Sequence, residues 1–486
     1  MDQTLMEKVL GWSDKDEFGK IIEAIEAVPE EERDYELTGQ LARALNNRGG
    51  EGDYERAVEL LEATREEGEQ DPNWHFRLGY SYYYMDREWL ALPEFERVLE
   101  LTPDDGDAKE FVEMCERCLE YPQPSKTFCQ RVEEFWNVFA GEEETVRQMM
   151  DNREDREQME KAADFMNQLL HTAFEEIYFE MGFNGVKYDL ILTAEGRKHR
   201  LFKLEYWKRH APLKLQERWN FLVGRQASPA VDKFALQMGG VTLDCSEIVV
   251  WPEKLEGNQV GISIYSEALA SLLKDNENAA YSMSGILLDQ SIGEMSSILH
   301  VGWLDILDAP MDQEGIWLAE LGQYIKSNID SSEEPVNICQ YFTSYQMKPS
   351  DLQQPWSLRE DVFVGNTACI DIVRSYYGGD DSLMNEHQAD GVVFGFFFYG
   401  NQKVERELMV PFRAEIEDEI TANAEDFGEI IGGATGSVYS YIDFVSYDLV
   451  TFVKLAREIL NKRDLDEIGF HVFRRNVGGV NLKKKK

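Results

Sequence analysis

The sequence has 486 residues, of which 43% are hydrophobic and 12% aromatic, so it is long and apolar enough for about three folded units. Its 49 Lys and Arg against 92 Asp and Glu give a net charge of −43, which disfavours general binding to nucleic acid or anionic lipid. Six cysteines are too few for a disulfide scaffold, and no apolar run approaches the ~20 residues of a membrane span. We therefore expect a cytoplasmic protein of bacterial type, whose acidity attracts a basic partner or serves solubility alone.

The acidity is concentrated in the first 120 residues, which hold 33 acidic and 13 basic side chains. Apolar residues recur there at helical spacing, and Gly and Pro fall between the apolar groups. This pattern predicts short antiparallel helix pairs, which cannot bury their apolar faces alone.

One register within this region is specific. The residues are Leu78-Gly79, Tyr82, Ala91, Phe95 and Pro103. Small side chains at 79 and 91 let two helices touch, the aromatic ring fills the gap, and the proline ends the second helix. The spacing resembles the 34-residue tetratricopeptide repeat.

Weaker matches flank this copy. Leu41, Ala42, Leu45, Ala57 and Leu61 fit a preceding copy with about three extra residues. Residues 18–29 resemble a truncated earlier copy, and 107–120 would form a capping helix. The resemblance covers roughly residues 18–120.

The resemblance implies a concave groove, lined by the first helix of each pair, that binds a peptide. Carried over by position, the partner-binding residues are Arg43, Asn46, Asn47, Asn73, Phe76, Tyr80, Tyr83 and Tyr84. Asn can hydrogen-bond a peptide backbone, and Tyr supplies amphipathic contact area. The alternative is that these aromatics pack against residues 126–181 of the same chain.

The rest of the chain predicts a multidomain α+β fold. We expect tetratricopeptide-like helical repeats over 1–120, a helical cap or connector over 126–181, α+β modules over 182–328 and 335–482, and a basic tail over 483–486. Residues 126–486 resemble uncharacterised bacterial α+β domains of unknown function. The expected strands include 188–192, 200–206, 219–223, 248–251, 260–265, 336–341, 361–364, 392–399, 407–412 and 470–474.

The two modules are candidates for a tandem duplication. A shift of 143 residues places Leu287-Leu288 on Ile430-Ile431 and Leu299 on Ile442. Periodicity alone can generate such matches, so the question stays open.

A basic island spans Arg197 to Arg218 and is interleaved with aromatic residues. This composition can bind single-stranded nucleic acid or phosphate. The competing explanations are the solvent side of a sheet and docking against the acidic N-terminal region.

Signals for catalysis are weak. Cys115-x-x-Cys118 has no second ligand pair, and the seven histidines show no HxxxH or HExxH spacing, so we expect no metal and no cofactor. Residues Gly432 to Gly436 predict a loop, with a tight strand connection favoured over an anion cradle. The carboxylates to test for catalysis are Glu429, Asp443, Asp448, Glu294 and Asp305.

The sequence favours a non-catalytic protein-interaction protein with a basic protein or peptide partner, one form being an immunity-type inhibitor. The alternative is a hydrolase-type or ligand-binding enzyme, with a site in the α+β modules near Gly432.

Overall fold

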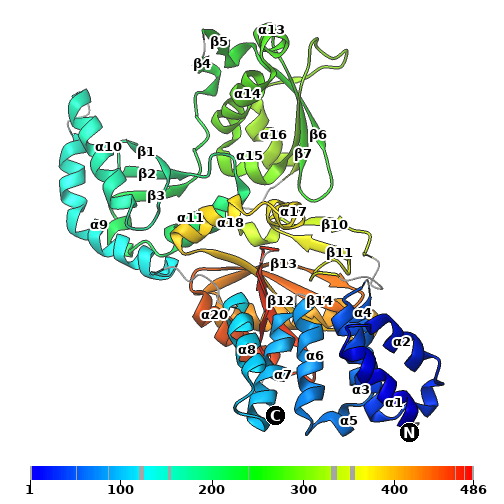
Figure 1. Ribbon diagram of the computed structural model, residues 1–486. Coiled ribbons are helices and arrows are strands. Elements are labelled where there is room, and N and C mark those ends of the chain that lie inside the picture. The colour runs from blue at the N-terminus through cyan, green and yellow to red at the C-terminus, as the bar shows by residue number, and fades with distance from the viewer. Residues whose placement is uncertain are drawn as a thin grey trace.

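The computed structural model describes residues 3–50, 52–85, 87–119, 125–151, 155–238, 240–329, 337–350, 356–465, 467–475 and 477–483. An N-terminal helical region is followed by mixed α/β structure, as expected (Figure 1). The predicted linkers at 121–125 and 331–335 lie almost entirely outside the described residues, as does the basic tail beyond Lys483.

The helical region, here called the arm, covers residues 3–119 and lies at one end of the molecule (Figure 1). A Cβ atom at Gly79 would lie 3.1 Å from the Phe95 ring, so glycine lets two helices approach closely at the predicted position. Its helices are α1 (Gln3–Ser13), α2 (Phe18–Glu26), α3 (Tyr35–Arg48), α4 (Asp53–Glu62), α5 (Arg65–Gly68), α6 (Pro72–Tyr84), α7 (Glu88–Leu101) and α8 (Gly106–Leu119).

The body, comprising residues 125–223 and 337–483, contains two sheets. In the smaller sheet β1 pairs antiparallel with β2, and β2 pairs parallel with β3 through helix α11. The larger sheet is antiparallel, in the order β10-β11-β13-β14-β12-β15-β16. The first part has α9 (Phe128–Asp151), α10 (Arg156–Leu170), β1 (Tyr178–Phe183), β2 (Tyr188–Thr193), α11 (Lys198–Arg209), α12 (Leu213–Gln216) and β3 (Trp219–Val223).

The larger sheet is buried on both faces. Along β12, Phe394, Phe396 and Phe398 enter one apolar cluster, while Phe397 and Tyr399 enter another beneath α19 and α20. Sheets covered on both sides carry long apolar runs, which explains this sequence. Its elements are β10 (Thr343–Gln346), β11 (Val362–Thr367), α17 (Ile370–Gly378), α18 (Ser382–Asp390), β12 (Val393–Gly400), α19 (Met409–Ala424), β13 (Gly428–Gly436), β14 (Tyr439–Ser446), α20 (Leu449–Leu460), β15 (Ile468–Val472) and β16 (Val480–Asn481).

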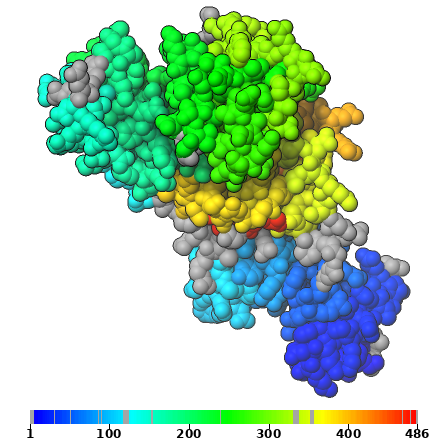
Figure 2. All heavy atoms as spheres, turned by 90° about the horizontal axis from the view of Figure 1, so that it is seen from above, coloured from blue at the N-terminus to red at the C-terminus, as the bar shows by residue number. Residues whose placement is uncertain are grey.

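A third unit, the 231–329 module, has an apolar core of its own. Figure 2, seen from the top of Figure 1, shows it as a separate green lobe with the arm extending beyond the body. Its sheet has the order β8-β7-β6-β9 and a parallel β7–β8 pair. Its elements are β4 (Ala235–Met238), β5 (Val241–Asp244), β6 (Val249–Lys254), β7 (Val260–Tyr265), α13 (Glu267–Asp275), α14 (Glu277–Ile292), α15 (Glu294–His300), β8 (Val301–Ile306), β9 (Ile316–Trp317) and α16 (Leu321–Asn328).

The cores divide the chain differently from the predicted modules. One apolar cluster joins α9, α10 and the β1–β3 sheet to one face of the seven-stranded sheet. The boundary predicted at residue 182 falls inside this cluster, and the helices of 126–181 share a core with residues far away in sequence.

Several predicted elements were wrong. Residues 200–206 form helix α11 because parallel strands β2 and β3 need a crossover. Residues 336–341 hold a 3₁₀ turn (Ile338–Gln340), and 407–412 lead from another such turn (Arg406–Leu408) into α19.

The glycine-rich segment 432–436 is also not a loop. It lies within β13, between β11 and β14. Gly432 has φ +145° at an irregularity in the β13–β14 register, and a Cβ atom there would lie 2.2 Å from the Asn366 carbonyl oxygen. Glycine is required here for close backbone packing rather than for a turn.

The residue pairing behind the proposed duplication is wrong as well. Leu287 and Leu288 lie in helix α14, whereas Ile430 and Ile431 lie in strand β13. Leu299 is helical in α15 and Ile442 is extended in β14. The shifted apolar positions therefore matched helical periodicity to strand periodicity.

Candidate functional site

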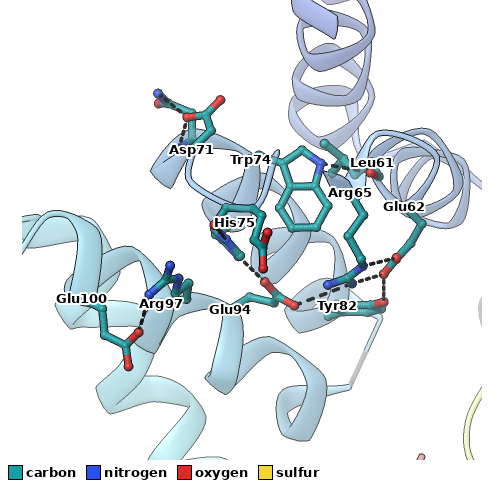
Figure 3. A network of polar contacts seen from close by, with 12 residues as sticks. Leu61, Glu62, Arg65, Asp71, Trp74, His75, Tyr82, Glu94, Arg97 and Glu100 are labelled. Atoms are coloured by element: carbon teal, nitrogen blue, oxygen red, sulfur yellow. Dashed lines mark hydrogen bonds and ion pairs between the residues drawn. The ribbon is translucent and has the colours of Figure 1, made fainter. Parts of the chain in front are cut away.

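Helix α6 of the arm is fixed along one side by polar contacts (Figure 3). Asp71 caps its start by accepting a hydrogen bond from the Asn73 amide at 2.9 Å. Trp74 Nε1 donates to the Leu61 carbonyl at 2.9 Å, and the Tyr82 hydroxyl donates to Glu62 at 3.1 Å. These bonds hold α6 against α4.

His75 joins α6 to α7. Its Nδ1 lies 2.5 Å from a carboxylate oxygen of Glu94 (Figure 3). Burial lowers the pKa of His75, but the hydrogen bonds to Glu94 and to the Glu69 carbonyl oxygen outweigh it, so the net pKa is raised. The pair is a charged clasp inside the arm.

The aromatic side chains of α6 form a second surface, here called the arm face. Phe76, Tyr80 and Tyr83 each pack against Phe111 of α8, with ring centroids 5.3–5.7 Å apart. Tyr84 stacks on Tyr54 at 5.5 Å and remains 47% exposed. The aromatic contacts recorded for these four side chains lie within the arm, not with residues 126–181.

The polar residues predicted for this groove divide into two groups. Asn46 is buried; it donates to the Arg77 carbonyl oxygen at 2.9 Å and accepts from Ser81 at 2.8 Å, so it joins α3 to α6 and is not available to a partner. Arg43, Asn47 and Asn73 are exposed. The sequence thus predicts seven side chains that are wholly or partly accessible and one that is not.

A cleft of about 660 Å³ lies between α11, β3, β13 and α19, and sequence reasoning found only one of its carboxylates, Glu429. Arg209 lies 3.0 Å from Glu429, and Cys339 Sγ donates to Glu429 at 3.3 Å. Lys208 contacts both oxygens of Glu205 at 3.2 Å. Four segments distant in sequence meet here, so no local motif could have indicated the cleft.

Two ionisable groups in the cleft favour their neutral forms. Burial raises the pKa of Glu205, and nearby Glu429 adds to the rise, although Lys208 opposes it. Burial and Glu429 also raise the pKa of the Cys339 thiol, so a reactive thiolate is disfavoured. The arrangement suits polar ligand binding or proton donation better than nucleophilic attack by sulfur.

The other carboxylates singled out in the sequence do not join this cleft. Asp443 is fully buried, 2.5 Å from the Arg359 guanidinium. Asp448 caps α20, and Glu294 accepts backbone hydrogen bonds from Gly196 and Arg225. Asp305 is exposed on β8. They do not form a catalytic constellation.

His199 on α11 meets His387 on α18 in the body interior. Nδ1 of His199 lies 2.8 Å from Nε2 of His387, and Glu386 brings a third possible metal ligand within 4.8 Å. Arg200 donates to Glu386 at 2.6 Å, and Lys203 lies 4.0 Å from it. These cations already neutralise the carboxylate and repel a metal ion.

Both histidines are held neutral. Burial lowers the pKa of His199 to about 4, and burial with nearby Lys203 lowers that of His387. The pair therefore serves as a neutral contact between α11 and α18.

The basic island is neutralised by the chain's own body, not by the acidic arm. Lys203 lies 2.5 Å from Asp390, and Arg218 lies 3.3 Å from Glu143. With Arg200 on Glu386 and Arg209 on Glu429, these pairs connect α11 and its surroundings to α18, α9 and β13. Little of the island's charge is left for a phosphate ligand.

No family model matches the sequence, and no curated protein matches it. Within the part of the chain that the structure describes, no helix combines the length and apolar character needed to cross a bilayer.

Proposed function

We propose that this chain is a non-catalytic, cytoplasmic protein-interaction protein, whose tetratricopeptide-like arm binds a protein or peptide partner. The observation that carries the proposal is the arm face, where Tyr84 is half exposed beside Phe76, Tyr80 and Tyr83. The contacts that fix α6 hold these rings in place before binding, which reduces the entropy lost on association.

The chemistry of the arm face suits a peptide with both polar and apolar groups. Tyrosine contributes rigid contact area with a hydroxyl at its edge, and Asn47 and Asn73 offer amide groups for backbone hydrogen bonds. The net charge of −43 favours a basic partner and speeds its approach. An inhibitor that neutralises a basic toxin is one protein of this kind.

Site-specific photocrosslinking tests the proposal. We would place benzoylphenylalanine at Tyr84 or, as a control, at Tyr178, which is equally exposed at 51%. Full-length protein is irradiated in source-cell extract at about 0.15 M and about 0.5 M salt, where the screening length falls from ~8 Å to ~4 Å. A discrete adduct from position 84 alone, weakened by Asn73→Ala, supports the proposal; no adduct, or equal adducts from both positions, contradicts it.

The cleft around Glu205 and Glu429 favours a second candidate function, a ligand-binding enzyme. Its volume is that of a small-molecule site, and Glu205 has the raised pKa expected of a proton donor. Native mass spectrometry of the purified chain, followed by denaturing extraction, tests for a retained small molecule. A ligand lost in Glu429→Gln but kept in Glu133→Gln would favour the enzyme; an unliganded mass in both would count against it.

A further inference from the structure

One face of the 231–329 sheet carries aromatic side chains that do not enter the module's core. Val250 of β6, Ile262 of β7 and Leu304 of β8 belong to that core, beneath the helices. Because side chains alternate along a strand, their neighbours Trp251, Gly261 and Trp303 lie on the opposite face. Figure 1 shows α14 and α16 on one side of β6 and β7 only.

This surface, here called the tryptophan face, consists of Trp251, Tyr265, Trp303 and Trp317 with Asp305. Trp303 lies directly over Gly261, where a Cβ atom would come within 2.1 Å of its ring, and the ring is 39% exposed. Trp317 is 52% exposed, and Val249 is its partner in the β6–β9 register. Trp251 Nε1 donates to the Gln313 carbonyl oxygen at 2.9 Å, which places segment 307–315 along one edge of the face.

Carboxylates surround these rings. The 231–329 module contains fifteen Asp and Glu and four Lys, a net charge of −11. Asp305, Asp308, Asp312 and Glu314 are exposed on β8 and the adjoining segment, and none has an ion pair among the described residues. Exposed indole rings beside unpaired carboxylates attract cations through both the ring quadrupole and the net charge.

We propose that the tryptophan face binds a lysine- or arginine-rich segment of a protein partner. Charge complementarity selects this occupant. A nucleic acid, an anionic lipid surface or a second copy of this acidic module would be repelled, whereas a basic segment can place its cations over the rings and against the carboxylates.

This surface is distinct from the arm face, so each can be tested separately. On the arm face the aromatic rings have arginine neighbours: Arg43 is exposed, and Arg77 lies close enough to Arg43 for each to disfavour the other's charge. The two aromatic surfaces therefore differ in local charge. The inference names the surface that gives the proposed interaction protein its preference for a basic partner.

The experiment measures binding of a fluorescent ten-residue peptide of alternating lysine and glycine to the full chain by anisotropy at about 0.15 M salt. Trp317→Ala removes an exposed ring but leaves its backbone hydrogen bond to Glu320 intact. We expect about two- to fivefold weaker binding, the effect of one exposed cation–π contact. Tyr84→Ala, which removes a similarly exposed ring from the arm face, should leave binding unchanged.

A charge-matched pair of variants separates this site from general attraction to an acidic protein. Asp305→Asn with Asp312→Asn and Glu133→Gln with Glu176→Gln each remove two exposed negative charges. The first should weaken binding about two- to fivefold and the second by less than twofold, because exposed charges act mainly over one screening length. These exposed sites lie outside the core, so thermal melting should confirm that all variants fold.

Equal loss in the two charge variants, or unchanged binding in Trp317→Ala, would overturn the proposal and leave general electrostatics. Loss confined to Tyr84→Ala would place the basic peptide on the arm face instead. Failure here leaves the crosslinking test at Tyr84 unaffected.

Discussion

Histidines in the arm and in the body respond to their surroundings in opposite ways. His75 in the arm contacts a carboxylate, and its pKa is raised. His199 and His387 in the body contact each other beside Lys203 and Arg200, and their pKa values are lowered. The arm stabilises a charged imidazole, whereas the body excludes one.

The difference follows from how each region is built. Contacts in the arm connect neighbouring helices: His75 and Glu94 are only 19 residues apart. Contacts in the body connect distant segments and are dry: Arg359 and Asp443 are 84 residues apart, and both side chains are wholly buried. We therefore expect charge removal to cost more in the body than in the arm.

The largest effect should come from Asp443→Asn. It leaves the Arg359 guanidinium buried without its counter-ion among the rings of Phe396, Tyr441 and Phe473, at a cost of about 3–5 kcal/mol. Hydrogen exchange of β14 and β12 amides measures the loss by region, which a chain of several folding units requires.

Two controls sharpen this test. Asp464→Asn removes an exposed carboxylate that pairs with Lys403, and it should cost less than about 1 kcal/mol. Replacing both buried partners, as Arg359→Met with Asp443→Leu, should recover much of the stability lost by Asp443→Asn. Equal costs for the buried and exposed single variants would contradict the contrast between dry and wet charges.

The next effect in size is acid destabilisation of the α11–α18 contact. As pH falls below 6.5, the unfolded chain takes up protons that the folded His199, with its pKa near 4, does not. Stability is therefore retained at neutral pH and lost between about pH 6.5 and 4, by about 3 kcal/mol. Hydrogen exchange in α11 and α18, corrected for intrinsic rates, measures it.

His387→Gln removes one of the two buried imidazoles and should reduce this acid dependence. His171→Gln changes an exposed histidine and serves as the control. If α11 and α18 were equally protected at pH 7 and pH 4, the histidine pair would not be the neutral contact described here.

The sequence predicted the arm better than the body because the arm's contacts are local. The Gly79–Phe95 approach and the aromatic cluster of α6 follow from the spacing of residues on adjacent helices. Asn46 was misplaced because spacing alone cannot tell the groove side of α3 from the side that packs on α6.

The body was less predictable because its site and core assemble from distant segments. Alternating apolar residues in 200–206 fitted a strand, and only the parallel pairing of β2 and β3 requires a helix there. The cleft combines residues near 205, 339 and 429, which no local pattern connects. Likewise, nothing near Arg359 in sequence indicates a buried arginine with φ +73°.

The smallest effect should be the pH dependence of the arm, with the opposite sign. Because the pKa of His75 is raised on folding, the His75–Glu94 contribution is fully present below pH 6.5 and is lost as pH rises through the folded pKa. Glu94→Gln should remove about 1 kcal/mol of protection in α6 and α7 at pH 6 and flatten the dependence. Glu100→Gln, in the exposed pair with Arg97, should change neither. If protection of α6 rose with pH, or if Glu94→Gln left the profile unchanged, the arm and the body would not differ in how they treat a buried imidazole.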